Sequence, residues 1–431
     1  MTPWTTEPLE DCLDALIDYR GKSPTKSDSG IPVLSAKVVK TTGLLRPIEQ
    51  TIAPDYYPKW MTRGYPKPGD VVMTTEAPLG EVIQLDAETA SFALGQRIVC
   101  LRGKPGKLDN TFLRYLLTSP TQQEVLASRA TGTTVLGISQ KALRSMPVSF
   151  PPISEQREIG ALLSSLDDKI ELNRKMNATL EAMARALFRD WFVDFGPTRA
   201  KMAGAEPYLS PDLWPLFPDR LDAEGKPEGW EVFSLGQIAD HHTRTLSPSE
   251  SPGALFEHFS LPAFDRDQNP ALDHGATIKS NKTLVPPGAI LLSKLNPEIP
   301  RVWLPEMPNG RQQIASTEFL AYTGKDGALR GLLFCLFSDD DIRKMLQAMV
   351  TGTSKSHQRI SPPDLLRREV ISGTAELFRR FDGSVMPLLN RVLANRTESR
   401  TLAQTRDLLL PKLMSGEVRV RQAEQLVGEA T

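Results

Sequence analysis

Cysteine and histidine are both scarce in this sequence, and neither forms a group. The three cysteines, Cys12, Cys100 and Cys335, are isolated and odd in number, and no CxxC pair occurs. This pattern argues against a disulfide framework and favours a reducing, cytoplasmic compartment. The five histidines show no HxxxH or HExxH spacing, so we expect no metal bound by this chain.

Signals for membrane insertion and for common catalytic chemistry are missing as well. The N-terminal segment carries acidic residues and no apolar core, and no apolar run approaches the roughly 20 residues of a membrane helix. We therefore expect neither a signal peptide nor contact with a membrane. The GKS tripeptide at Gly21–Ser23 lacks the first glycine of a phosphate-binding loop, because Leu16 occupies that position. No GxSxG elbow and no glycine-rich cofactor loop occurs, so we expect no catalytic residue and no cofactor on this chain.

The composition is that of a globular protein without a strong charge imbalance. Hydrophobic residues make up 40% and charged residues 24% of the 431 residues, and the formal net charge is −1. This length predicts two or three domains. A neutral total argues against a non-specific polyanion binder, although binding depends on where the charges lie locally.

A long amphipathic helix is the clearest element in the chain. Residues 166–188 contain neither glycine nor proline, and the helical pattern extends over Ser154–Phe195, which predicts a helix about 60 Å long. An apolar seam with heptad-like steps is narrow enough for one partner helix. Its residues are Ile159, Leu163, Leu166, Ile170, Asn173, Asn177, Leu180, Ala184, Leu187 and Trp191. The two asparagines either fix the register and the partner number, or lie where the helix drifts and Met176 replaces them in the seam.

The chain repeats itself weakly, with an offset near 222 residues. The matches are Ile138 with Ile360 and Asn173 with Asn395 at 222, Gly103 with Gly324 at 221, and KPGDVVM (67–73) with PPGAILL (286–292) at 219. Offsets that drift by a few residues are what loop insertions produce. We interpret each half as a strand-rich globular domain followed by a long helix.

This repeat predicts the fold class and the domain boundaries. The fold is expected to be α+β, with two similar globular domains joined by two long antiparallel helices in a coiled coil with internal pseudo-two-fold symmetry. The expected segments are a first globular domain (1–152), a central long helix (153–196), a proline-rich linker (197–228), a second globular domain (229–373), a C-terminal long helix (374–421) and a tail (422–431). We expect Leu388, Val392, Leu402 and Leu409 to face the first helix, and Pro387 to kink the second helix or mark its start.

Several motifs resemble the specificity (S) subunits of type I restriction–modification systems. They are PPISEQREIGALLSSLDDKIELNRKMNATLEAMARALFRDWFVDFGP (151–197), LFPDRLDAEGKPEGWE (216–231), LLLPKLMSGEVRV (408–420), DYRGKSP (18–24) and TTEAPLGEV (74–82). The resemblance covers nearly the whole chain in the same order. It is most specific in the two long helices and weaker in the second globular domain.

The resemblance implies a non-catalytic DNA reader whose two globular domains are target recognition domains. Each would read one half of an asymmetric, bipartite site on double-stranded DNA, and the helices would set the gap between the halves. The implied partners are two modification (methyltransferase) subunits, which carry the S-adenosylmethionine, and restriction subunits with ATP-dependent translocase and nuclease activity. Trp191, Phe192 and Phe195 are more aromatic surface than a two-helix seam can bury. They either pack against a domain or belong to the surface that, by the resemblance, docks the modification subunits.

Polar loops supply the candidate DNA contacts, because phosphates attract cations and base edges pair with forked or amide side chains. In the first domain the candidates are Arg20, Lys22, Lys26, Lys37, Gln96, Arg97, Thr133 and Thr134. In the second domain they are Arg244, Lys294, Asn296, Arg301, Ser354, Lys355, His357, Gln358 and Arg359. Each of them could instead be a solvated surface residue. Glu76, Glu81 and Glu318 either accept from cytosine or form salt bridges.

Two other classes of function are compatible with the sequence. One is a helical scaffold or adaptor that reads no DNA, and the other is a fused enzyme with a dispersed active site. Lysine and arginine in turn-like loops of both globular domains favour the DNA reader over the scaffold. The enzyme would require activity from this chain alone.

Overall fold

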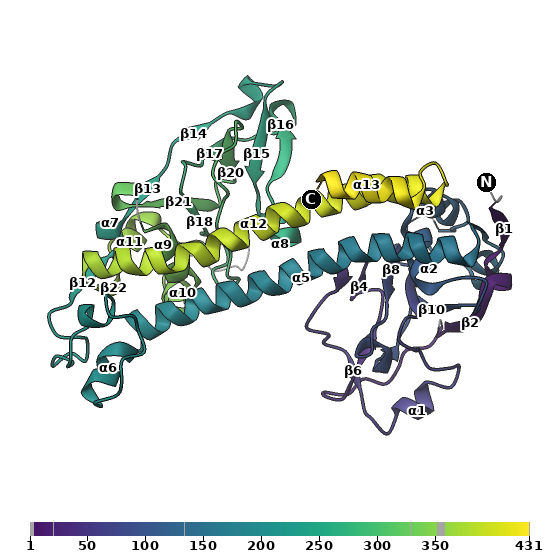
Figure 1. Ribbon diagram of the computed structural model, residues 1–431, viewed down its shortest axis with the longest axis horizontal. Helices are drawn as coiled ribbons and strands as arrows, with labels where there is room; N and C mark the ends of the chain where they lie inside the picture. The colour runs from purple at the N-terminus through teal and green to yellow at the C-terminus, as the bar shows by residue number, and fades with distance from the viewer. Residues whose placement is uncertain (1–3, 20, 133, 328, 351–357, 431) are drawn as a thin grey trace. The chain divides into compact units, whose positions relative to one another are not determined.

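The computed structural model describes residues 4–19, 21–132, 134–327, 329–350 and 358–430 (Figure 1). Contacts divide the chain into two units, residues 1–171 with 398–431 and residues 172–397. Each unit combines one β-rich domain with part of each of two long helices, α5 (Ile153–Phe192) and α12 (Ala375–Met414). The chain is therefore a mixed α+β protein with two β-rich domains, as the sequence predicts.

A four-stranded antiparallel sheet in the order β2-β10-β7-β8 forms the centre of the first domain. A three-stranded sheet, β6-β3-β9, and the pairs β1-β11 and β4-β5 accompany it. The strands are β1 (Thr5–Pro8), β2 (Leu13–Asp18), β3 (Ile31–Leu34), β4 (Val39–Lys40), β5 (Gly43–Leu44), β6 (Thr51–Ile52), β7 (Val71–Thr75), β8 (Leu79–Gln84), β9 (Ala93–Leu94), β10 (Ile98–Gly103) and β11 (Pro147–Phe150). The β-branched runs of β7 and β10 are the most buried, as their composition predicts.

Besides α5 and α12, the first domain and its unit contain five α-helices among the described residues. They are α1 (Tyr57–Trp60), α2 (Asn110–Thr118), α3 (Pro120–Ser128) and α4 (Gln140–Arg144), and α13 (Val420–Ala430) belongs to the same unit. Helices α2 and α3 are separated at Ser119, whose side chain caps α3 while Pro120 takes its first position. The end of the chain, expected to be a tail, forms α13 because Ala423 is fully buried in the core of this unit.

The second domain is built around a four-stranded sheet, β13-β21-β18-β19, and a five-stranded sheet, β14-β17-β20-β15-β16. The strands are β12 (Glu231–Ser234), β13 (Ala239–His242), β14 (Thr245–Leu246), β15 (Leu255–Phe259), β16 (Ala271–His274), β17 (Lys282–Leu284), β18 (Ile290–Ser293), β19 (Val302–Trp303), β20 (Gln313–Ala315), β21 (Phe319–Gly324) and β22 (Glu369–Gly373). The helices are α7 (Leu235–Ile238), α8 (Leu261–Asp267), α9 (Arg330–Ser338), α10 (Asp340–Ala348) and α11 (Pro362–Leu366). A short helix, α6 (Gly196–Met202), follows α5 and lies almost entirely in the segment expected to be a proline-rich linker (197–228).

The two β-rich domains share a common core topology, although the further strands around it differ. The pair β1-β11 corresponds to β12-β22, the sheet β2-β10-β7-β8 to β13-β21-β18-β19, and the parallel pair β3-β9 to β15-β20. Helices α2 and α9 have nine residues each, and α5 and α12 have 40 residues each, with first residues 222 apart (375 − 153). The internal repeat inferred from the sequence is thus present in the fold.

Helices α5 and α12 lie side by side and run antiparallel (Figure 1). In one unit, Arg406 Nη1 donates to Asp167 Oδ1 at 2.6 Å. In the other, Asn173 Nδ2 donates to the main-chain oxygen of Asn395 at 3.4 Å, and the rings of Phe188 and Phe381 lie 5.9 Å apart. Asn173 and Asn395 are repeat equivalents and are almost fully buried. This supports the register interpretation of the seam asparagine over a drifting helix.

The seam itself agrees only in part with the sequence pattern. Leu166, Ala184 and Trp191 are buried as expected, whereas Ile170, Leu180 and Leu187 are half-buried, and Phe188 replaces Leu187 in the core. On α12 the expected Leu388 is half-buried and its neighbour Leu389 is fully buried, while Val392, Leu402 and Leu409 are buried as predicted. Pro387 does not mark the start of the helix, because α12 begins at Ala375.

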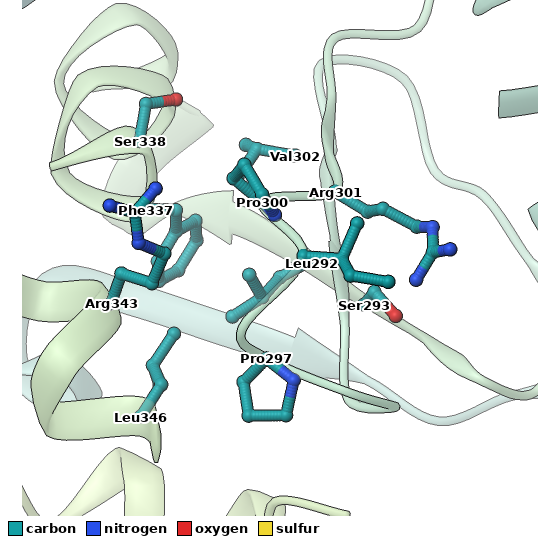
Figure 2. A pocket seen from close by; sticks show the side chains of 11 residues that line it. Leu292, Ser293, Pro297, Pro300, Arg301, Val302, Phe337, Ser338, Arg343 and Leu346 are labelled. Carbon is teal, nitrogen blue, oxygen red and sulfur yellow. The ribbon is translucent and has the colours of Figure 1, made fainter. Parts of the chain in front are cut away.

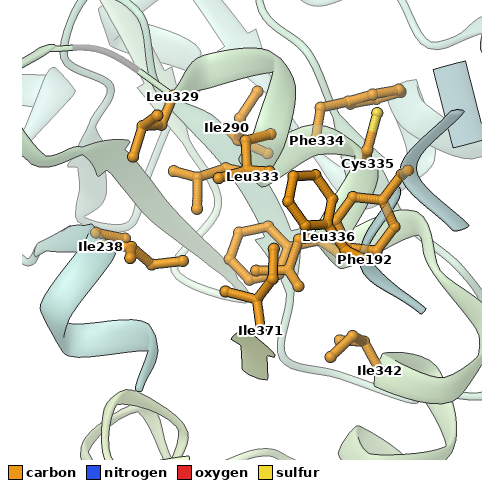
Figure 3. Close-up of a cluster of buried hydrophobic side chains, with 14 of the residues drawn as sticks. Phe192, Ile238, Ile290, Leu329, Leu333, Phe334, Cys335, Leu336, Ile342 and Ile371 are labelled. Atoms are coloured by element: carbon orange, nitrogen blue, oxygen red, sulfur yellow. The ribbon is translucent and has the colours of Figure 1, made fainter. Parts of the chain in front are cut away.

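The aromatic residues at the end of α5 belong to a hydrophobic core. Trp191 and Phe192 are 1% and 5% exposed, and the Phe195 ring lies 5.7 Å from that of Trp230. Phe192 is part of a cluster that includes Leu333 and Leu336 of α9 (Figure 3). Of the two roles expected for these aromatics, the structure shows packing against a domain, because the core of the second domain buries Trp191 and Phe192. Among the described residues, no helix is both long enough and apolar enough to span a membrane.

Candidate nucleic-acid interface

Three segments of the first domain meet where β7 ends. The amide of Thr75 donates to the carbonyl of Arg97 at 2.8 Å, and the amide of Ile138 donates to the carbonyl of Thr75 at 3.0 Å. Glu76 forms an isolated β-bridge with Gly137. We call this meeting of residues 75–76, 97 and 137–138 the first junction. It brings the candidate Arg97 and residues 137–138 together at the end of β7.

The second domain contains the same junction. The amide of Lys294 donates to the carbonyl of Glu318 at 2.9 Å, the amide of Ile360 donates to the carbonyl of Lys294 at 3.0 Å, and Leu295 bridges Arg359. We call residues 294–295, 318 and 359–360 the second junction. Its offsets from the first are 219 (294 − 75), 221 (318 − 97) and 222 (360 − 138). Equivalent main-chain hydrogen bonds in the two domains are therefore separated by 219 to 222 residues, the same range of offsets that the sequence repeat shows.

The side chains of the first junction are accessible. Arg97 adopts a left-handed backbone conformation with φ of 61°, and its Nη2 lies 3.7 Å from Glu76 Oε1. The two side chains are 53% and 43% exposed. Gln96 beside them is half-buried and Thr134 is exposed. The candidate Thr133 lies outside the described residues.

The second junction holds a tighter ion pair. Arg359 donates to Glu318 through Nε at 3.1 Å and through Nη2 at 3.0 Å, and their side chains are 40% and 24% exposed. These hydrogen bonds raise the pKa of the Arg359 guanidinium. Asn296 and Gln358 are half-buried, and the Asn296 amide donates to the Gln358 carbonyl at 3.2 Å. Ser354, Lys355 and His357 lie outside the described residues.

The remaining candidates lie outside these junctions. Lys22 and Lys26 are exposed in the segment that follows β2, and Arg20 of the same segment lies outside the described residues. Lys37 Nζ lies 2.9 Å from Glu49 Oε2, with both side chains more than three-quarters exposed. Exposed pairs of this kind contribute little stability and are easily exchanged for a phosphate. Arg244, before β14, is also exposed.

Arg301 has a structural partner. Its Nε and Nη2 donate to the two carboxylate oxygens of Asp265 at 2.7 and 2.8 Å, and only 10% of the side chain is exposed. Arg301 also lines a small, largely apolar pocket with Phe337 and Arg343, where its guanidinium points away from that of Arg343 (Figure 2). A DNA phosphate would have to compete with Asp265 for this side chain.

Two features of the site were not found from the sequence. The carboxylates Asp265 and Glu49, which hold Arg301 and Lys37, are distant in the chain and share no motif with them. Val135 and Leu136, at the loop that enters the first junction, are 48% and 51% exposed. The sequence contained a signal for Val135 and Leu136 as candidate DNA contacts, because they form an apolar pair inside an otherwise polar loop. Apolar side chains of this kind contact the thymine methyl group.

The described part of the chain offers binding chemistry at both junctions. Of the three acids singled out from the sequence, Glu76 and Glu318 pair with arginines. Glu81 accepts from the amide and hydroxyl of Thr41 at 2.6 and 2.7 Å. Among the described residues, no group of three or more histidine, cysteine, aspartate and glutamate side chains is arranged to hold a metal ion. Guanidinium groups with exposed surface are the donors suited to phosphates and purine edges.

Comparisons with known proteins give a consistent result. The family model described as the type I restriction modification DNA specificity domain matches residues 4–182. The type I restriction enzyme MjaIX specificity subunit of Methanocaldococcus jannaschii is 27% identical over 371 residues, which are 84% of this chain and 80% of the relative. The type I restriction enzyme HindI specificity subunit of Haemophilus influenzae is 24% identical over 406 residues, covering 82% of this chain and 87% of the relative.

A solved structure shares the fold. The crystal structure of a type I restriction–modification system S subunit from M. genitalium superposes with a TM-score of 0.52 at 18% identity. The superposition covers 96% of this chain and 99% of the other. It places both β-rich domains and both long helices within one known architecture.

Proposed function

The chain belongs to the specificity subunits of type I restriction–modification systems, and we propose that its two β-rich domains each read one half of a bipartite, asymmetric DNA site. The observation that carries this proposal is the repeated junction. Two domains with a common core topology present guanidinium groups from the same main-chain frame, but with different surrounding side chains. A duplicated frame with different side chains is what two unlike half-sites require.

As a specificity subunit the chain is the non-catalytic component of a type I restriction–modification complex. We propose that two modification subunits supply the methyl transfer and hold S-adenosylmethionine, and that restriction subunits supply ATP-dependent translocation and cleavage. The two long helices are proposed to dock the modification subunits and to set the gap between the half-sites. The domain boundaries given above are proposed as the units that carry these roles.

The candidate residues remain proposals with different roles. Lys22, Lys26, Lys37 and Arg244, exposed and outside the junctions, are suited to phosphate contacts, which position the protein without reading sequence. Arg97 and Arg359 at the junctions are suited to base edges. A scaffold that reads no DNA has no use for a frame that presents guanidinium groups twice, so the DNA reader is favoured.

The experiment that tests the proposed function is sequencing of methylated bases in the host, with and without this gene. We expect a methylated motif of two short, different sequences with a fixed gap, and we expect it to disappear when the gene is deleted. A salt-dependent gel shift of duplex DNA by this chain with its methyltransferase partner should select the same motif. Methylation that is unchanged by the deletion, or a shift without sequence preference, would favour the scaffold.

A further inference from the structure

Each junction contains one guanidinium and one carboxylate, but equivalent positions of the main chain carry the arginine in one domain and the glutamate in the other. In the first junction the residue before β10 is Arg97, and its carboxylate partner, Glu76, follows β7. In the second junction the equivalent residue, before β21, is Glu318, and the guanidinium of Arg359 comes from the segment equivalent to Gly137. The same point of the main-chain frame therefore carries opposite charge in the two domains.

Guanidinium and carboxylate groups differ in what they can read on a base pair. A guanidinium donates two parallel hydrogen bonds to O6 and N7 of guanine, and a carboxylate accepts from N4 of cytosine. In the second junction both oxygens of Glu318 already accept from Arg359, which leaves this carboxylate less able to accept from cytosine. The Arg359 guanidinium is thereby held in one orientation, so less conformational freedom is lost when it meets a base. In the first junction Glu76 lies 3.7 Å from Arg97, an ion pair without a hydrogen bond, which orients the guanidinium less firmly. In both junctions the guanidinium is the group suited to guanine.

We propose that Arg97 and Arg359 each determine one guanine in their own half-site, and that Glu76 and Glu318 are positioning residues that orient them. The inference rests on the proposed function and names the side chains that would carry its selectivity. Because the guanidinium groups enter from different segments of the frame, the guanine stands at a different place in each half-site. The two half-sites are then unlike, as an asymmetric site requires.

The two readers also differ in stringency. Glu318 holds Arg359 through both oxygens at 3.0 and 3.1 Å, whereas the nearest approach of Glu76 to Arg97 is 3.7 Å. A guanidinium fixed by two hydrogen bonds cannot turn toward a different pattern of acceptors. Discrimination at the guanine should therefore be stricter for Arg359 than for Arg97.

The test uses the complex of this chain with its methyltransferase subunits and a duplex library of random sequence, followed by sequencing of the methylated products. With the parent, both half-sites should be defined. Glu318→Gln and Arg359→Lys should each lower selectivity at one and the same base pair by roughly tenfold, within the range of a good bidentate contact. Glu76→Gln and Arg97→Lys should lower selectivity at one base pair of the other half-site, and Glu76→Gln should have the smaller effect of the two glutamate variants.

Control variants separate positioning from general damage. Glu298→Gln, an exposed carboxylate near the second junction, should leave both half-sites unchanged. The double variant Glu318→Gln/Arg359→Lys should lose no more selectivity than Arg359→Lys alone, because the carboxylate acts through the arginine. A uniform loss of methylation on all sequences, or unchanged selectivity in both Glu318→Gln and Arg359→Lys, would overturn the inference alone. A parent complex that methylates without sequence preference would overturn the proposed function as well.

Discussion

Asp167 on α5 accepts hydrogen bonds from three side chains of its unit. Arg114 Nη2 and Tyr115 Oη donate to Oδ2, each at 2.7 Å, and Arg406 of α12 donates to Oδ1 at 2.6 Å. The Asp167 side chain is only 15% exposed, so solvent cannot replace it. This residue ties the first domain to both long helices.

We predict that Asp167→Asn destabilises this unit by about 1–3 kcal/mol, because an amide nitrogen replaces an acceptor oxygen and leaves a buried donor unpaired. Chemical denaturation followed by circular dichroism measures the loss. The matched control is Asp168→Asn, at an exposed position of the same helix, which should change stability little. Equal effects of the two variants would show that the three hydrogen bonds do not matter.

His241 on β13 should make stability depend on pH. Its ring lies 5.0 Å from that of Tyr322, and burial, with smaller contributions from His242 and Lys294, lowers the pKa of His241. The folded chain therefore binds a proton less readily than the unfolded chain, whose histidine titrates near 6.5. Stability from this residue is present above that pH and is lost as the pH falls through it.

The variant His241→Phe keeps the aromatic contact and removes the titration. We predict a shallower decline of the unfolding midpoint between pH 7 and pH 5 than in the parent. His274→Asn, at an exposed position, serves as the control and should follow the parent curve. A His241→Phe curve with the parent's slope would contradict the assignment.

At the level of single side chains, the sequence indicated which residue types could contact DNA but not their partners. Arg359 and Glu318 are 41 residues apart, and Arg301 and Asp265 are 36 apart. Their pairing depends on strands that meet only in the folded domain. No local pattern encodes such a contact, which is why Arg301 and Arg359 look alike in sequence and differ in exposure.

The buried seam of the long helix α12 can be tested directly by truncating its leucines. Leu389 is fully buried and Leu388 is half-buried. Leu389→Ala is expected to cost about 2–5 kcal/mol, through lost burial and the cavity that remains. Leu388→Ala should cost clearly less, and Leu408→Ala, at 58% exposure, should cost little. Denaturation midpoints in that order confirm the seam, and a larger loss for Leu388→Ala would restore the sequence-based register.

The helices were predictable because their pattern is local and long. The expected span of 154–195 is close to the observed α5, Ile153–Phe192, and the offset of 222 carries over to α12. Errors arose where neighbouring elements decide which face is buried: the one-residue shifts from Leu388 to Leu389 and from Leu187 to Phe188 both follow from the core of the second domain. Pro387 lies at an exposed position inside α12, and the helix continues through it between the buried residues Val385 and Leu389.

At the scale of the whole molecule, the duplication predicts the number of partners. We expect one chain to bind two methyltransferase subunits, because the fold contains two repeat-related long helices of equal length. On α5, Leu172 and Met183 are 51% and 48% exposed and lie eleven residues, or about three turns, apart on one face. Such exposed apolar residues are suited to a helical partner.

Native mass spectrometry at saturating partner concentration should show a two-to-one complex. The double variant Leu172→Asp/Met183→Asp should weaken binding of the methyltransferase subunit that contacts this face of α5. Ala178→Asp, at an exposed position on another face of the same helix, is the control and should leave binding unchanged. A strict one-to-one complex for the parent would contradict the prediction. Unchanged assembly of the double variant would place the docking surface elsewhere.

The junctions are held by main-chain bonds, so the frame does not depend on which side chains it presents. Thr75 and Lys294 occupy the same place in it although one is a buried hydroxyl residue and the other a half-buried amine. A combinatorial library at positions 76, 97, 318 and 359 should accordingly yield many folded variants, each with its own preferred DNA. The junction is thus a natural place to reprogram this protein, one half-site at a time, by exchanging two side chains and leaving every strand intact.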